Sequence, residues 1–234
     1  MAVLVVQHQR TCPPGRLGDW LTDADVDLDV RHPYAGDPLP HDLSGHDGLI
    51  VLGGQMGHAD DAAAPWLSAT RGLIRTAAKG AVPTLGICLG HQLAASALGG
   101  TVARNPRGRT LGMFSVLGSA GLSTDPVLEA AEAAPVVQWN DDIVTELPTG
   151  ATALAVNACG DLLLARLAPT VWGVQGHPEA DHDIVADWAS KDAGTTELAD
   201  VDVPAVLTEI EGSGPAVEAA WRPVATAFAA VLRR

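Results

Sequence analysis

The stretch "AVPTLGICLGHQLAASALGG", residues 81–100, decides the fold, because a strand pattern turns into a helix pattern at a single cysteine. The apolar run over 81–87 predicts a buried strand, and the residues after Cys88 predict a helix. A turn this tight favours a strained backbone and needs small neighbours two positions away on either side. Gly86 and Gly90 supply them in a G-x-C-x-G pattern. Cys88 is therefore either a buried structural residue or a nucleophile held on a sharp turn.

The start of a helix suits the second interpretation of Cys88. Partial positive charge and free N–H groups at a helix N-terminus favour the thiolate form. The same N–H groups can hold a developing oxyanion, and the N–H of Leu89 is the first candidate. A second donor is expected from the Gly53–Gly54 pair, which ends a neighbouring apolar strand. Ligands in open α/β sheets bind along this carboxyl edge.

Outward from this stretch, short apolar runs alternate with helical patterns. The first half predicts strands at 2–6, 25–30, 47–54 and 81–87 with helices between them, which indicates a mostly parallel central sheet flanked by helices. We expect an α/β fold of the flavodoxin-like type. Residues 101–177 read as short strands with one helix at 125–134, so we expect a small antiparallel extension. A helical C-terminal tail follows from Asp181, and the pattern predicts one domain over residues 1–234.

Composition excludes several classes of function. The chain is 47% hydrophobic and 18% charged, which is typical of a globular protein, and its formal net charge is −14. Such acidity argues against nucleic-acid binding, because no basic stripe is present to displace counterions. No apolar run has the length of a membrane span, and no signal peptide is apparent. The three cysteines are scattered and odd in number, which favours a reducing, cytoplasmic location.

A base and an orienting group are expected at "TVWGVQGHPEA", residues 170–180. The apolar strand stops at His177, and residues two apart in an extended segment point the same way. His177 and Glu179 are then on one side, with Pro178 stiffening the link and the carboxylate fixing the imidazole tautomer. The alternative interpretation is a surface turn, since H-P-E is a reasonable turn tripeptide.

Other chemistry-bearing groups are weaker candidates. His58 with Asp60 and Asp61, and the histidines and acids of 177–182, lack the spacing of a metal site, so we expect no metal. The G-x-G-x-x-G spacing of a dinucleotide loop is absent, so we expect no cofactor. His91 follows Cys88 on the same helix and is expected to be structural.

Taken together, "GICLGHQ" (86–92), "LGGQMG" (52–57) and "GHPE" (176–179) resemble the class I glutamine amidotransferases, in particular stand-alone proteins similar to the glutaminase domain of GMP synthase. The resemblance implies that Cys88 attacks the γ-carboxamide of glutamine, forming a γ-glutamyl thioester and releasing ammonia. It further implies that His177 shuttles protons and Glu179 orients it. Gly54 and Leu89 resemble the family's oxyanion hole, and Gln92 resembles a residue that contacts the substrate.

One segment departs from the family. The stretch 136–148, read as a strand, resembles the segment that lines the glutamine pocket, but Trp139, Asn140 and Asp141 stand where the GMP synthase branch has Ser, His and Gly. We expect these three residues to bind substrate, and their size and charge leave open whether that substrate is glutamine or another γ-glutamyl compound.

Three functions stay open at this point. The chain contains no P-loop and no synthetase domain, so a glutaminase would supply a separate ATP-dependent synthetase. The first alternative is a γ-glutamyl hydrolase or peptidase that acts on its own. The second is a non-catalytic or partner-activated binding module with the same fold, and it requires that the protein's cellular role survive Cys88→Ser.

Overall fold

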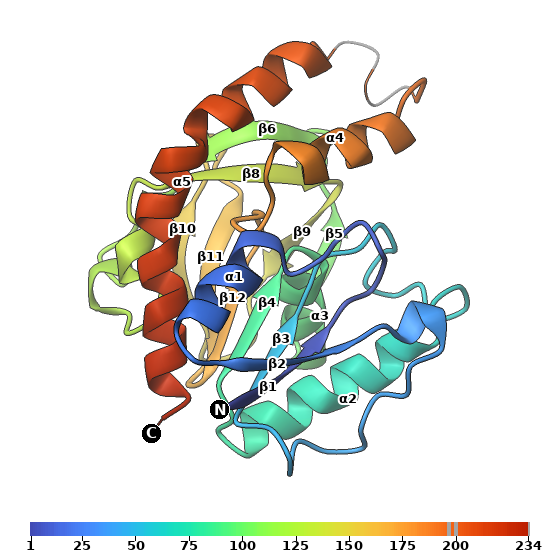
Figure 1. Ribbon diagram of the computed structural model, residues 1–234, viewed down its shortest axis with the longest axis vertical. Helices are drawn as coiled ribbons and strands as arrows, with labels where there is room; N and C mark the ends of the chain where they lie inside the picture. Colours follow the sequence, from blue (N-terminus) through green and yellow to red (C-terminus); the bar gives the residue numbers. More distant parts are fainter. Residues whose placement is uncertain (196–197, 199–200, 234) are drawn as a thin grey trace.

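Five parallel strands form the centre of the fold in the computed structural model, which describes residues 1–195, 198 and 201–233. The strands are β1 (Ala2–Val6), β2 (Asp27–Arg31), β3 (Gly48–Val51), β4 (Thr84–Ile87) and β12 (Val171–Val174). They lie in the order β2-β1-β3-β4-β12, and every neighbouring pair is parallel (Figure 1). This is the strand order of flavodoxin-like sheets, so the predicted fold class is confirmed.

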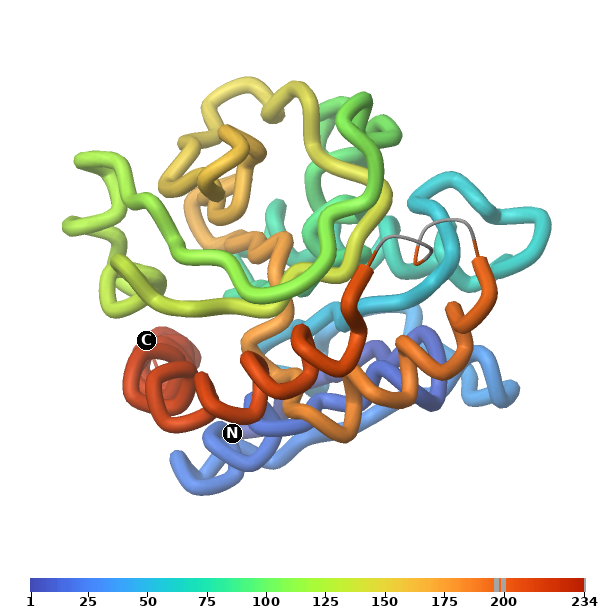
Figure 2. Tube along the Cα trace, turned by 90° about the horizontal axis from the view of Figure 1, so that it is seen from above, coloured from blue at the N-terminus to red at the C-terminus, as the bar shows by residue number. Residues whose placement is uncertain are grey.

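Helices cover both faces of this sheet. They are α1 (Gly15–Asp23), α2 (Trp66–Lys79), α3 (Leu89–Ala97), α4 (His182–Lys191) and α5 (Val203–Val231). Alternate residues of β1 point to opposite faces: Val3 and Val5 join the core under α1 and α5, whereas Leu4 and Val6 join the core under α2 and α3. The helical tail was predicted, and α5 runs through Pro215 and Pro223 along one side of the molecule (Figures 1 and 2).

The predicted antiparallel extension is also present. Beyond β12 the sheet continues through β11 (Leu162–Ala168), β10 (Thr152–Val156) and β7 (Leu117–Gly118), each antiparallel to its neighbour. Two separate ribbons pair β5 (Thr101–Arg104) with β9 (Asp142–Glu146) and β6 (Thr110–Ser115) with β8 (Pro135–Asn140). The segment 136–148 is thus two strands with different partners, which separate at Asp141, and not one.

The prediction of a helix at 125–134 is wrong. Within 125–134 the chain forms one short 3₁₀ turn, at Glu129–Ala131; further 3₁₀ turns lie at Leu122–Thr124 and Pro33–Ala35. The side chain of Asp125 accepts hydrogen bonds from the backbone N–H groups of Val127 and Leu128, as a helix N-cap does. The backbone nevertheless leaves the helical region at Glu132, with ψ +131°, and at Ala133, with φ +58°, so no regular helix follows.

The site is positioned by strands that end at the same edge. Residues 52–54 follow β3, Cys88 follows β4, and residues 175–179 follow β12, three adjacent parallel strands. Between α4 and α5, Val185, Trp188 and Ile210 form a smaller apolar cluster beside this edge. The sequence of residues 191–202, between the helical patterns of the tail, predicts a loop, and its residues 196, 197, 199 and 200 lie outside the described residues.

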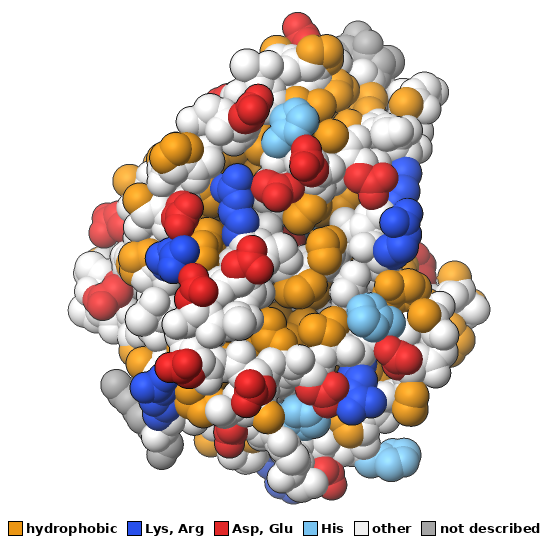
Figure 3. All heavy atoms as spheres, in the orientation of Figure 1, with side chains coloured by type: hydrophobic (Ala, Val, Ile, Leu, Met, Phe, Trp, Pro, Cys, Tyr) orange, Lys and Arg blue, Asp and Glu red, His pale blue; other side chains and the backbone are white. Residues whose placement is uncertain are grey.

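Two global expectations can be compared with the structure. Among the described residues, no helix has both the length and the apolarity needed to cross a membrane. On the face drawn in Figure 3, acidic and basic side chains are interspersed and are not gathered by sign.

Candidate active site

Cys88 stands at the sharp turn between β4 and α3. Its backbone has φ +49° and ψ −105°, a conformation that costs free energy for a residue with a side chain. A Cβ on Gly86 would lie 2.5 Å from the carbonyl oxygen of Gly90, and a Cβ on Gly90 would overlap the carbonyl oxygen of Val51. Both glycines are therefore required by close backbone approach, as the sequence pattern predicted.

His177 and Glu179 lie beside this turn and form a buried pair. His177 Nδ1 and Glu179 Oε1 are 2.7 Å apart, and the two side chains are 3% and 1% exposed. The backbone N–H of His177 donates to the carbonyl of Val137, and the carbonyl of Glu179 accepts from Arg16, so both ends of the H-P-E segment are fixed. The segment is therefore part of the interior and not a surface turn.

The imidazole of His177 also packs against two neighbours. The Trp188 ring lies 4.6 Å from it, centroid to centroid, at 56°. A Cβ on Gly53 would come within 3.0 Å of His177 Cε1, so the backbone itself packs against the ring. Trp188 is held in turn by its indole N–H, which donates to the carbonyl of Thr11 at 2.6 Å. The ring thus has little freedom to turn away from Cys88.

The charges around His177 favour the imidazolium. Burial alone would lower the pKa of His177, but the charges of Cys88 and Glu179 and its hydrogen bonds to both outweigh burial and raise the pKa to about 10. Because Nδ1 faces Glu179, Nε2 is left to face the Cys88 sulfur. The arrangement therefore favours the imidazolium form of His177 beside the Cys88 sulfur.

A second cysteine, Cys12, lines the same cleft and has the opposite character. Its sulfur accepts from the side-chain amide of Gln9 at 3.2 Å. Burial and the nearby charges of Glu179 and Cys88 raise the pKa of the Cys12 thiol, so it stays protonated. The sequence offered no signal for Cys12, which lies far from Cys88 along the chain.

The two predicted oxyanion donors lie next to each other. A Cβ on Gly54 would lie 2.9 Å from the Leu89 side chain, so the loop after β3 passes directly in front of the first turn of α3. Leu89 is the first residue of that helix, where N–H groups point beyond the helix end. A Cβ on Gly54 would also lie 2.6 Å from Met56 Sδ, so a side chain there would require Met56 to move.

Gln92 borders the cleft, one helical turn after Cys88, but its amide group is already bonded to the protein. Its Nε2 donates to the carbonyl of Asp142 at 2.9 Å and to Gln175 Oε1 at 3.3 Å, and the residue is 4% exposed. Its contact with substrate stays a prediction.

Trp139, Asn140 and Asp141 form the opposite wall of the cleft at the end of β8. The indole of Trp139 donates to Asp192 at 2.9 Å, and Asp192 also accepts from Arg109 at 2.6 Å. The Arg109 guanidinium lies 5.7 Å from the centre of the Trp139 ring. Asp141 pairs with Arg104 at 3.2 Å. Binding of substrate by these residues stays a prediction.

These groups enclose one cleft of about 770 Å³. The wall of the cleft combines the Cys88 sulfur and the His177 imidazole with polar and charged groups from several separate regions of the chain. The lining residues are Gln9, Cys12, Gly54, Gln55, Met56, Gly57, Asp60, Cys88, Gln92, Arg104, Arg109, Trp139, Asn140, Asp141, Asp142, His177, Trp188, Lys191 and Asp192. Within the described part of the chain, no group of three His, Cys, Asp or Glu residues is placed to hold a metal ion.

Several residues around the cleft were not found from the sequence. Gln175 lies two residues before His177, so the same alternation that paired His177 with Glu179 was a usable signal. Trp188, Arg109 and Asp192 reach the site through tertiary contacts only, and no local pattern marks them.

Comparison with known proteins places this fold and site in a family. Residues 21–185 match the family model of glutamine amidotransferase class-I, which is more than half of the chain. The chain belongs to the class I glutamine amidotransferase family.

Individual relatives of the chain differ in their activities. It is 29% identical to gamma-glutamyl peptidase 4 of Arabidopsis thaliana over 153 residues, which cover 64% of this chain and 60% of that protein. It is 36% identical over 105 residues to one subunit of the glutamine-hydrolyzing GMP synthase of Saccharolobus solfataricus, covering 43% of this chain and 53% of the relative. A glutamine amidotransferase structure from Thermotoga maritima superposes with a TM-score of 0.87 at 24% identity, covering 98% of each chain.

Proposed function

We propose that the protein is a cysteine hydrolase that cleaves the side-chain amide of glutamine or of a related γ-glutamyl compound. The observation that carries the proposal is the buried pair of His177 and Glu179, 2.7 Å apart, set against Cys88 on its strained turn. This combination of nucleophile, base and orienting carboxylate is the general arrangement of covalent acyl transfer.

The proposed reaction has two steps. The Cys88 thiolate adds to the amide carbon, and the N–H groups of Gly54 and Leu89 hold the oxygen that gains negative charge. His177 gives its proton to the leaving nitrogen, which departs as ammonia or an amine and leaves a γ-glutamyl thioester. His177 then takes a proton from water, the hydroxide attacks the thioester, and the released γ-carboxylate and the Cys88 thiolate restore the starting state. Glu179 keeps Nε2 directed at these groups throughout.

Glutamine hydrolysis coupled to a separate synthetase is the first form of this proposal. Its support is the family match and the similarity to one subunit of a glutamine-hydrolyzing GMP synthase. In that form the ammonia passes to an ATP-dependent partner, and turnover rises when the partner binds.

Hydrolysis of a larger γ-glutamyl amide is the second form. The cleft of about 770 Å³ lies in the size range that buries drug-sized ligands and exceeds what glutamine fills. The similarity to plant gamma-glutamyl peptidases agrees with such a substrate.

Turnover of three substrates tests the proposal and separates its forms. Glutamate release from glutamine, γ-glutamyl-p-nitroanilide and γ-glutamyl dipeptides is measured, and the kcat/KM values are compared. A preference for glutamine supports the first form, and a preference for the dipeptides supports the second. No turnover of any of them, together with no labelling of Cys88 by a glutamine-mimicking electrophile, rejects both forms.

A further inference from the structure

A chain of buried side-chain amides begins at the Cys88 sulfur. Gln175 Nε2 donates to Cys88 Sγ at 3.6 Å, and Gln175 Oε1 accepts from Gln92 Nε2 at 3.3 Å. Gln92 also donates to the backbone carbonyl of Asp142 at 2.9 Å. Gln175 is 0% exposed, so its amide has no access to solvent. The proton transfers proposed above use neither glutamine.

The backbone carbonyl of Asp142 dictates how both amides are turned. A carbonyl oxygen can only accept, so Gln92 must direct its NH₂ group toward Asp142 and Gln175. Gln175 must then offer its oxygen to Gln92, which leaves its NH₂ group for the sulfur. The reverse orientation of Gln175 would oppose two NH₂ groups and place a carbonyl oxygen against a thiolate, and both contacts are repulsive.

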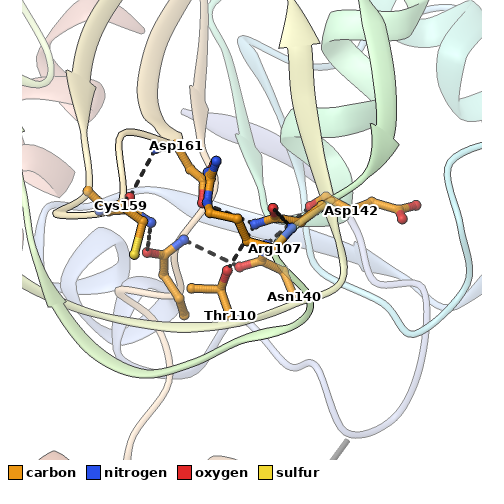
Figure 4. A network of polar contacts seen from close by, with 9 residues as sticks. Arg107, Thr110, Asn140, Asp142, Cys159 and Asp161 are labelled. Atoms are coloured by element: carbon orange, nitrogen blue, oxygen red, sulfur yellow. Dashed lines mark hydrogen bonds and ion pairs between the residues drawn. The ribbon is translucent and has the colours of Figure 1, made fainter.

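A second chain of side-chain amides also donates to the backbone carbonyl of Asp142. Asn140 donates to the Asp142 carbonyl at 3.1 Å, Gln138 donates to Asn140, and Asn157 donates to Gln138 at 2.9 Å. Asn157 in turn accepts backbone N–H groups of the 159–161 turn, the end of the network at which Figure 4 labels Cys159 and Asp161. Because the Asp142 carbonyl accepts from both sides, the orientation of Gln92 does not depend on Gln138.

We propose that Gln175 is a positioning residue for Cys88, whose amide N–H holds the sulfur and stabilises it as the thiolate. Gln92 and the backbone of Asp142 hold that amide in the required orientation. A hydrogen bond to the charged form favours that form, and it is stronger in a buried setting. The inference rests on the proposed function for its catalytic meaning, and it gives Gln92 a role other than contact with substrate.

The test is the pH dependence of Cys88 alkylation in Gln175→Leu and Gln175→Glu. Iodoacetamide is the probe, and mass spectrometry of the Cys88 peptide excludes signal from Cys12 and Cys159. In Gln175→Leu the midpoint of the pH profile is expected to rise by about one pH unit, a tenfold lower thiolate fraction at a given pH, because a charge-assisted hydrogen bond is lost. Gln175→Glu keeps the size of the side chain but adds a carboxylate, and the rise is expected to be larger.

Gln138→Leu is the matched control. Gln138 is also 0% exposed and belongs to the same network, but it lies beyond the Asp142 carbonyl. Its substitution is expected to lower Tm as much as Gln175→Leu does and to leave the alkylation midpoint unchanged. An equal midpoint shift in Gln138→Leu would assign the effect to general loosening and overturn the inference.

NMR spectroscopy of the unaltered protein provides a second test. The ¹H–¹⁵N signal of the Gln175 side-chain amide is expected to move over the same pH range in which Cys88 becomes reactive. A static signal overturns the inference, as does an unchanged midpoint in folded Gln175→Leu. Neither readout requires turnover. A shifted midpoint without hydrolysis of any γ-glutamyl compound rejects the proposed function and keeps the inference. Hydrolysis with an unchanged midpoint keeps the proposed function and rejects the inference.

Discussion

The two walls of the cleft are built by different means. The wall at the edge of the parallel sheet is built mainly by backbone: Cys88 stands on its strained turn, and a Cβ on Gly53 or Gly54 would come within 3.0 Å of a neighbouring side chain. The opposite wall depends on side chains, since Trp139 is held by Asp192, which also binds Arg109.

Burial follows the same division. The side chains of His177 and Glu179 are 3% and 1% exposed, whereas those of Arg109 and Asp192 are 14% and 15% exposed. A side chain added at Gly86 or Gly90 would displace a strand or a helix, because backbone atoms approach closely there. Ion pairs at the rim can be exchanged singly. The structure thus separates the proposed chemistry from the proposed choice of substrate, and four predictions probe that separation.

The largest effect is expected for Cys88→Ser. With the nucleophile removed, kcat for a γ-glutamyl substrate should fall by about four orders of magnitude or more. Since the turn is set by Gly86 and Gly90, Tm should change by less than about 2 °C. Steady-state kinetics and thermal unfolding check the two parts, and retention of most of the activity would falsify the assignment of Cys88.

Gly90→Ala should break the backbone-built wall. The new Cβ would overlap the carbonyl of Val51, and the free energy of unfolding is expected to fall by about 3 kcal/mol. The control is Gly72→Ala in the interior of α2, where a Cβ meets nothing within 4 Å and a gain of up to about 1 kcal/mol is expected from helix propensity. Urea unfolding measures both, and equal effects at the two sites would contradict the close approach at Gly90.

Acid should weaken the parallel half through two buried histidines. Burial lowers the pKa of His8 to about 3 and that of His91 to about 4. The unfolded chain takes up these protons near pH 6.5 and the folded chain does not, so stability is complete above pH 6.5 and falls as pH drops below it. Each histidine lowers the free energy of unfolding by about 1.4 kcal/mol for every pH unit below 6.5. This loss ends near pH 4 for His91 and near pH 3 for His8, where the folded chain also takes up the proton.

Urea unfolding between pH 7 and pH 4 measures this slope. His91→Leu removes one of the two groups, and the slope should fall to about half. The same slope in the variant would show that His91 takes up its proton without unfolding.

The smallest effect is expected at the side-chain-built wall. Asp192→Ala removes the acceptor shared by Trp139 and Arg109, and KM for a γ-glutamyl substrate should rise about tenfold with kcat unchanged, because binding that is equal in the ground and transition states is lost. Asp183→Ala is the control, since Asp183 is an exposed acid on α4 that pairs with His182. A fall in kcat at constant KM would show that this wall takes part in the chemistry.

The same contrast explains what could be predicted from the sequence. Four of the parallel strands, β1, β3, β4 and β12, are buried and read as largely apolar runs, and the glycine spacing around Cys88 reports a backbone constraint directly. His177 and Glu179 were paired on the expectation of an extended segment; the structure brings them together through a turn after β12.

Errors and omissions come from interactions across the fold. The helix expected at 125–134 does not form, because the backbone leaves the helical region at Glu132 and Ala133, and Asp125 instead accepts from the distant Trp172 indole. Trp188 is held by a hydrogen bond to the carbonyl of Thr11, which is far away in the sequence. Cys12 is also distant from Cys88 in the sequence, and only the fold brings it to the cleft. Such partners carry no local pattern.

The position of β12 in the sheet has a consequence for the order of events during synthesis. This strand lies between β4 and β11, so β4 has an unpaired edge until β12 is made. The same strand leads directly to His177, which leaves the ribosome 89 residues after Cys88 (177 − 88). Completion of the sheet and arrival of His177 are therefore one step, and the nascent chain carries Cys88 before its proposed base is made.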